Sequence, residues 1–134
     1  MTNLVDIEGI AETYAAKLHE AGVGTVEALL SEGATPAGRK QIAEASGIGD
    51  ERILKWVNHA DLFRINGVAG EYAELLEAAG VDTVVELGHR NAENLTEKLG
   101  EVNESKRLVR RVPSLSEVTR WIDEAKALPR AVTY

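Results

Sequence analysis

The segment IEGIAETYAAKLHEAGVGTVEALL (residues 7–30) decides the fold, because the chain repeats it as INGVAGEYAELLEAAGVDTVVELG (residues 65–88). Twelve of the 24 aligned positions are identical, at a constant offset of 58 residues. A repeat of this length predicts two similar structural units in one chain.

A second pair of segments, KWVNHAD (55–61) and RWIDEAK (120–126), aligns at an offset of 65. The second copy therefore carries seven additional residues, which fall near 100–114. We expect residues 1–64 to form the first unit and residues 65–134 the second, with both sharing one compact core.

The spacing of apolar residues predicts helices throughout. Such residues recur at intervals of three and four, as an amphipathic helix requires. Gly22 and Gly80 are placed to end helices, and Thr25 and Thr83 are placed to cap the next ones. No segment alternates with a period of two, so we predict an all-α fold of short helices in two tandem pairs with an approximate internal twofold repeat. The residues expected to be buried are Leu18, Ile53, Trp56, Leu76, Val118 and Trp121.

Local capping patterns predict the starts of two further helices. Thr35 and Pro36 read as a cap followed by proline in the first helical position. Ser114 and Glu117 fit a capping box that opens the last helix.

Four of the turns between expected helices, numbered 1 to 4, are candidates for a binding site. Turn 2 is Gly47-Ile48-Gly49, within EASGIGDERILKW (residues 44–56). Turns 1 and 3, at residues 9–11 and 67–69, keep one glycine and have alanine in place of the second, and turn 4, at residues 112–114, has none. Glycine permits either a tight helix-to-helix turn or the close approach of a ligand to the backbone. Both interpretations remain open.

Short helices joined by such turns resemble a tandem helix-hairpin-helix protein. Over nearly its whole length the chain is similar to an uncharacterised bacterial domain-of-unknown-function family, with GRKQIAEASGI (38–48), ILKWVNHADLFRI (53–65) and LVRRVPSLSEV (108–118) carrying the resemblance. The wider helix-hairpin-helix superfamily implies binding of DNA without sequence readout, through backbone N–H groups that donate to phosphate oxygens. It also implies a possible monovalent cation at turn 2, which the sequence leaves open.

The charge pattern is compatible with two partners. The net charge is −7, yet residues 105–134 hold seven basic and three acidic residues. If the basic cluster there is helical, residues 106 and 110 share a face, as do 107 and 111; it either contacts phosphate or pairs with the acidic stretch at 93–104. Carboxylates also flank turns 1 to 3, and they disfavour phosphate at a helix N-terminus. The candidate nucleic-acid-binding residues are Gly47, Ile48, Gly49, Arg52, Lys55, Lys106, Arg107, Arg110 and Arg111.

Other classes of function find no support in the sequence. The chain has no cysteine, its three histidines lie at no zinc-ligand spacing, and it contains no phosphate-binding loop or nucleophile elbow. We expect no enzyme activity, no cofactor, no metal and no membrane association, and a cytoplasmic location. The leading hypothesis is weak, sequence-independent binding of duplex DNA; the alternative is a module that binds a protein partner.

Overall fold

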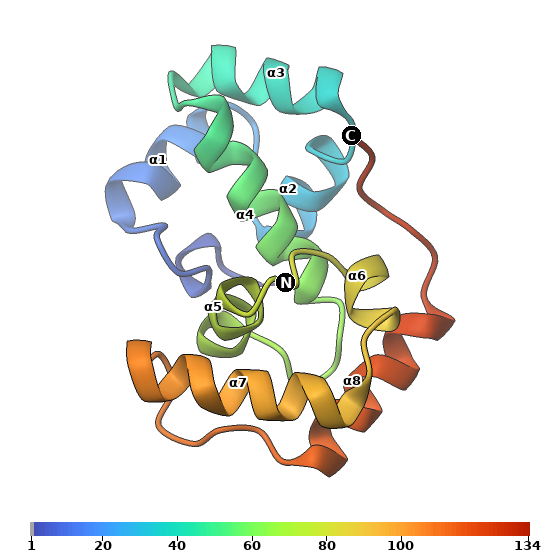
Figure 1. Ribbon diagram of the computed structural model, residues 1–134. Helices are drawn as coiled ribbons and strands as arrows, with labels where there is room; N and C mark the ends of the chain where they lie inside the picture. Colours follow the sequence, from blue (N-terminus) through green and yellow to red (C-terminus); the bar gives the residue numbers. More distant parts are fainter. Residues whose placement is uncertain (1) are drawn as a thin grey trace. The chain divides into compact units, whose positions relative to one another are not determined.

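The computed structural model describes residues 2–134, which contain eight α-helices, one short 3-10 helix and no β-strand. The prediction of an all-α fold is therefore confirmed, whereas the approximate twofold symmetry remains a prediction. The chain divides into two compact units, one made of Met1–Asp61 with Ala131–Tyr134 and the other of Leu62–Arg130. Figure 1 shows the helices in chain order.

The first unit holds a 3-10 helix and four α-helices. In chain order they are η1 (Leu4–Asp6), α1 (Glu12–Glu20), α2 (Val26–Glu32), α3 (Pro36–Ser46) and α4 (Asp50–Leu62), whose last residue belongs to the second unit. The C-terminal residues complete this unit: Thr133 donates its N–H to the Ala34 carbonyl (2.8 Å), and the Tyr134 hydroxyl donates to Asn58 Oδ1 (2.8 Å).

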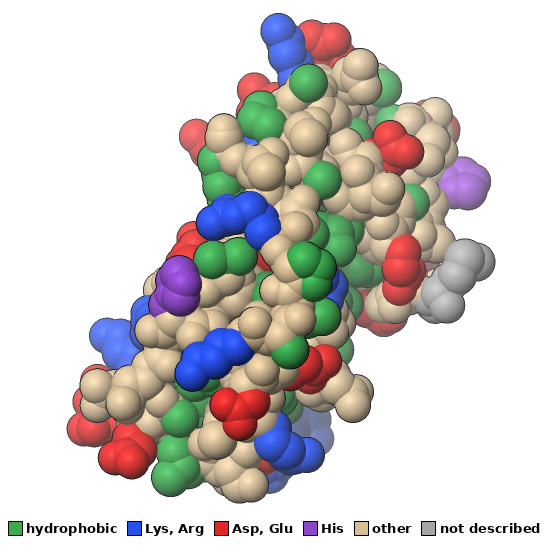
Figure 2. Space-filling model, turned by 90° about the vertical axis from the view of Figure 1, so that its right-hand side faces the viewer, with side chains coloured by type: hydrophobic (Ala, Val, Ile, Leu, Met, Phe, Trp, Pro, Cys, Tyr) green, Lys and Arg blue, Asp and Glu red, His purple; other side chains and the backbone are tan. Residues whose placement is uncertain are grey.

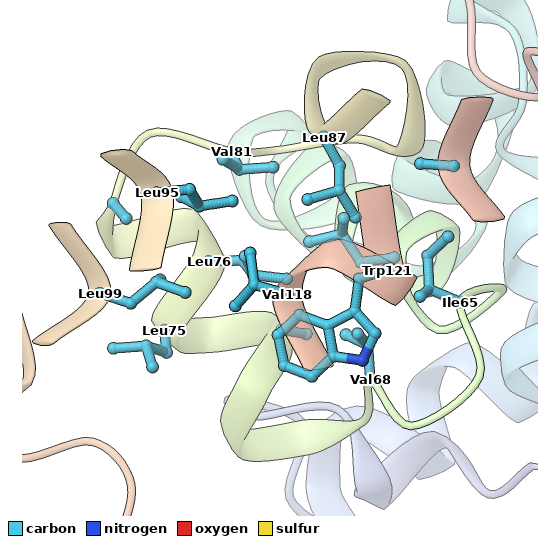
Figure 3. Close-up of a cluster of buried hydrophobic side chains, with 14 of the residues drawn as sticks. Ile65, Val68, Leu75, Leu76, Val81, Leu87, Leu95, Leu99, Val118 and Trp121 are labelled. Atoms are coloured by element: carbon cyan, nitrogen blue, oxygen red, sulfur yellow. The ribbon is translucent and has the colours of Figure 1, made fainter. Parts of the chain in front are cut away.

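The second unit is formed by the remaining four helices, which are α5 (Gly70–Ala78), α6 (Val84–Gly88), α7 (Ala92–Lys106) and α8 (Leu115–Ala127). Helix α8 packs against α6 and α7. Figure 3 shows the core of this unit, where Leu76 of α5, Leu99 of α7 and Val118 and Trp121 of α8 converge. Burial of apolar surface in this core stabilises the unit.

The predicted helix ends are confirmed. Helix α1 stops before Gly22, which has φ +90°, and α5 stops before Gly80, which has φ +94°. The hydroxyl oxygens of Thr25 and Thr83 accept hydrogen bonds from backbone N–H groups three residues ahead, at 3.0 and 3.4 Å. These signals are local, so the sequence alone specifies them.

The six residues predicted to be buried are all in the core, each with at most 4% of its surface exposed. Trp56 and Trp121, at corresponding positions of the two copies, are 2% and 4% exposed. The prediction that both tryptophans are core residues is confirmed.

Candidate nucleic-acid interface

Turn 2 joins α3 to α4 in the first unit and is anchored by one buried side chain. Gly47 ends α3 in the left-handed conformation, with φ +74°, and its N–H donates to the Ala43 carbonyl (2.9 Å). Ile48 is 4% exposed, and its N–H donates to Ser46 Oγ (3.2 Å). Both glycines are exposed, so the outer side of the turn faces open space.

The two glycines of turn 2 meet different requirements. A Cβ added at Gly47 or Gly49 would have no heavy atom within 4 Å beyond its chain neighbours. Gly47 needs glycine for its positive φ, but Gly49 has neither a positive φ nor a close neighbour. Packing inside the protein therefore does not explain the second glycine.

Side-chain capping divides the helices into two groups. Five helices begin with a Ser, Thr or Asn side chain that accepts a backbone N–H bond; these caps are Thr25, Thr35, Thr83, Asn91 and Ser114. Helices α1 and α5 follow turns 1 and 3 and begin at Ala11 and Ala69, which make no side-chain cap bond. Helix α4 follows Gly49, which has no side chain to offer.

In the three helices that follow turns 1 to 3, no cap side chain accepts a hydrogen bond from the first backbone N–H groups. The first intrahelical bond of α4 runs from Ile53 N–H to the Gly49 carbonyl (3.2 Å). The preceding N–H groups have no partner within the helix, and they lie at its positive dipole end. Turn 4 is different, because Ser114 and Glu117 form a full capping box at the start of α8.

In the first unit, aromatic and basic side chains gather where α1 and α4 begin. The rings of Tyr14 and Trp56 are 5.1 Å apart between centroids, at an interplanar angle of 60°. Arg52, in the first turn of α4, places its guanidinium carbon 5.3 Å from the centre of the Tyr14 ring. Lys17 Nζ lies 6.0 Å from the same ring centre. The helices after turns 1 and 2 thus begin close together, beside two cations.

Carboxylates also occupy these first turns. Glu12 lies in the first turn of α1, and Asp50 and Glu51 lie in the first turn of α4. They compensate the helix dipole in part, so any anion bound here competes with them. Arg52 and Lys55, the basic candidates near turn 2, are both exposed.

The basic cluster of the second unit is not one helix, so the predicted sharing of faces by residues 106, 107, 110 and 111 is wrong. Helix α7 ends at Lys106, and Arg107 adopts the left-handed conformation, with φ +52° and ψ +49°. The Asn103 side chain fixes the loop that follows, because its amide donates to the Val109 carbonyl (3.1 Å) and accepts from the Val109 N–H (2.9 Å). Arg107 and Arg110 line an open groove of about 530 Å³ in this unit.

Arg111 forms an ion pair with Glu117, which was predicted only as part of the capping box of the last helix. Its two terminal nitrogens donate to the two carboxylate oxygens of Glu117, at 2.6 and 2.9 Å. Hydrogen bonds from Arg111, and then from the Ser114 backbone, lower the pKa of Glu117 from its ordinary 4.5 to about 2. The predicted alternative, pairing with the 93–104 stretch, is replaced for Arg111 by pairing within the capping box of α8.

The candidate residues therefore fall into two sets. Gly47, Ile48, Gly49, Arg52 and Lys55 belong to the first unit, and Lys106, Arg107, Arg110 and Arg111 to the second. On the face drawn in Figure 2, acidic and basic side chains are interspersed.

Tyr14 and Lys17 are part of the neighbourhood where α1 and α4 begin but are not among the residues predicted from the sequence to bind nucleic acid. Their neighbourhood with Arg52 depends on the packing of α1 beside α4, and no local motif encodes it. The basic residue Arg39 has a structural role, because it is buried and donates to the carbonyls of Gly33 (2.9 Å) and Thr133 (2.8 Å).

Within residues 2–134, no group of three or more histidine or carboxylate side chains is placed to hold a metal ion. No helix in the same range is long and apolar enough to cross a lipid bilayer.

Fold and candidate site together define an all-helical protein in which turns 1 to 3 lead into helices without a side-chain cap. Residues 8–128 match the family described as Domain of unknown function (DUF4332), and the chain belongs to that family. No curated protein and no solved structure matches the chain significantly.

Proposed function

We propose that this protein is a non-enzymatic module that binds duplex DNA weakly and without sequence preference, through the helix-hairpin-helix turns of its first unit. The contacts are made to the phosphate backbone, which carries no sequence information directly. Arg52 and Lys55 contact phosphates beside turn 2, and Lys106, Arg107 and Arg110 add long-range attraction.

The observation that carries the proposal is the distribution of helix caps. The chain supplies a capping side chain at five helix starts and none after turns 1, 2 and 3. Uncapped N–H groups at a positive dipole end suit a phosphate oxygen. Gly49 supports the same function, since nothing inside the protein requires a glycine there and a phosphate could approach its backbone closely.

The charge distribution determines how strongly we expect the protein to bind DNA. Two to four phosphates neutralised by basic side chains correspond to a slope of log K against log salt of roughly −2 to −4. Because the net charge is −7 and carboxylates flank the turns, the dissociation constant is expected near the weak end of non-specific binding, on the order of 10⁻⁴ M at physiological salt.

Fluorescence anisotropy with a labelled DNA duplex tests the proposal. We expect saturable binding at low salt, similar affinity for duplexes of unrelated sequence, and the salt slope given above. Arg110→Glu, at an exposed position, should reduce the affinity without changing the melting temperature.

The alternative is a module that binds a protein partner. It is favoured by Asp50 and Glu51, which would repel a phosphate but could pair with basic side chains of a partner. Absence of DNA binding at high protein concentration and low salt would reject the DNA proposal and leave this alternative.

A further inference from the structure

The ring of Trp56 is buried, but its indole nitrogen is an accessible hydrogen-bond donor. Trp56 as a whole is 2% exposed, but its Nε1–H, which makes no hydrogen bond within residues 2–134, is not fully buried. A Cβ built on Gly9, in turn 1, would lie 3.3 Å from Nε1, and no other atom beyond the chain neighbours lies within 4 Å of that position. The nitrogen is therefore directed at turn 1, where only a glycine leaves it uncovered.

The second copy repeats this arrangement. Trp121 is 4% exposed, its Nε1–H likewise has no acceptor in the described part of the chain, and a Cβ on Gly67 would lie 3.4 Å from the nitrogen. Figure 3 shows the nitrogen on the edge of the Trp121 ring next to Val68, in turn 3. The same uncovered donor therefore occurs at corresponding positions of the two copies, where a ligand can reach it.

The chemistry of the surroundings specifies the ligand. An indole N–H can only donate a hydrogen bond. The backbone at the neighbouring start of α1 also offers N–H donors, because Ala11 provides no side-chain cap. A ligand atom that meets both must be an acceptor, and the positive helix end favours one with negative charge.

We propose that Trp56 Nε1 donates a hydrogen bond to a phosphate oxygen of DNA bound at turn 1, and that Gly9 is glycine to leave that donor open. This inference rests on the proposed function and names a contact of the same site. It assigns a ligand-binding role to a side chain that is otherwise part of the core.

The two copies differ in a way that places the site in the first unit. The residue one turn before Trp56 is Arg52, whereas the residue one turn before Trp121 is Glu117. Lys17, beside Tyr14, is replaced in the second copy by the buried Leu75. Trp56 thus has two cations near its aromatic partner, whereas the equivalent surroundings of Trp121 have a carboxylate held by Arg111.

Nuclear magnetic resonance of the ¹⁵N-labelled full chain tests the inference directly. The chain has two tryptophans, so two indole N–H signals are expected, and a tryptophan-to-phenylalanine variant assigns each. On titration with a short DNA duplex at low salt, we expect a saturable downfield shift of the Trp56 indole proton and a smaller change at Trp121. Inorganic phosphate should move the same Trp56 signal at higher concentration.

The DNA affinities of two matched tryptophan-to-phenylalanine variants provide a second test. Trp56→Phe keeps a ring in the core and removes the donor, and it should weaken DNA binding about tenfold or more, the loss expected for one hydrogen bond to a charged group. Trp121→Phe makes the same change in the second copy and should leave the affinity within about twofold of the original. Melting temperatures of both variants show whether the core is equally affected.

The outcomes separate this inference from the proposed function. DNA binding that shifts backbone signals of residues 47–52 but leaves the Trp56 indole signal unmoved would overturn the inference and keep the function. A Trp56 shift with phosphate but no binding of DNA would overturn the assignment of DNA as the ligand. No response to either probe would overturn both.

Discussion

The indole of Trp56 packs edge-on against the phenol ring of Tyr14, and Trp121 packs in nearly the same way against Tyr72, with ring centroids 5.1 and 5.4 Å apart. The two copies thus preserve an aromatic pair that joins two helices. They differ in what surrounds it: Tyr14 faces the cations of Arg52 and Lys17, whereas the Tyr72 hydroxyl donates to the Arg111 carbonyl (2.9 Å).

Removing either indole should destabilise the protein strongly. Trp56→Ala and Trp121→Ala each leave a large cavity in a core, at an expected cost of about 3–5 kcal/mol in the free energy of unfolding. Urea denaturation followed by circular dichroism measures this cost. A loss below about 1 kcal/mol in either variant would contradict the assignment of that ring to the core.

Adding a missing cap should raise stability and compete with DNA. Ala11 is exposed and has the extended backbone of a cap, with φ −93°, so Ala11→Ser should increase the free energy of unfolding by about 1 kcal/mol. The new hydroxyl would accept an N–H bond proposed for phosphate, so DNA affinity should fall roughly two- to tenfold.

The matched control is Ala69→Ser, at the corresponding start of α5. It should stabilise the protein to a similar degree while leaving DNA affinity unchanged, since the proposed site is in the first unit. Equal losses of affinity in both variants would show that turns 1 and 3 bind alike.

Prediction from sequence succeeded where the determining contacts are local. The caps at Thr25 and Thr83 and the stops before Gly22 and Gly80 involve residues within a few positions of each other, so residue type and spacing suffice. Burial of the tryptophans also followed from spacing, because an apolar stripe on a helix must face a core.

Prediction failed where one side chain redirects the backbone. Helix α7 ends at Lys106 although no glycine or proline follows directly, and Arg107 takes a left-handed conformation. The Asn103 side-chain amide holds the next loop by donating to the carbonyl of Val109 and accepting from its N–H. A non-glycine residue with positive φ is uncommon and has no clear sequence signal. The meeting of Tyr14 with Arg52 likewise depends on helix packing.

The Arg111–Glu117 pair should make stability depend on acid pH. The pKa of Glu117 is lowered to about 2 in the folded protein, so its contribution is present above pH 4.5 and is lost as the pH falls toward 2. Glu117→Gln lacks this contribution at every pH, and the stability curves of the variant and the original protein should converge near pH 2. Thermal unfolding measured from pH 2 to 7 checks this; a constant difference over that range would contradict it.

The two glycines of turn 2 should respond differently to substitution. Gly47→Val forces a branched side chain into φ +74° and should cost about 1–2 kcal/mol or more. At Gly49 the space is open and φ is not positive, so Gly49→Val should change stability by less than about 0.5 kcal/mol. If phosphate approaches the turn 2 backbone, Gly49→Val should nevertheless reduce DNA affinity, which anisotropy would detect. A variant that binds DNA as well as the original protein would remove turn 2 from the interface.

Reversing one charge near turn 2 should separate a local contact from the effect of net charge. Arg52→Glu and Arg120→Glu change the net charge equally, and both positions are exposed, but only Arg52 lies at the proposed interface. Arg52→Glu should weaken DNA binding and bring the slope of log K against log salt closer to zero by about one unit, because one phosphate contact is lost. Arg120→Glu should lower the affinity only slightly and leave the slope unchanged, since it alters the overall field without removing a contact. Equal effects of the two substitutions would mean that DNA responds to the total charge of the protein, and the proposed interface at turns 1 and 2 would then be wrong.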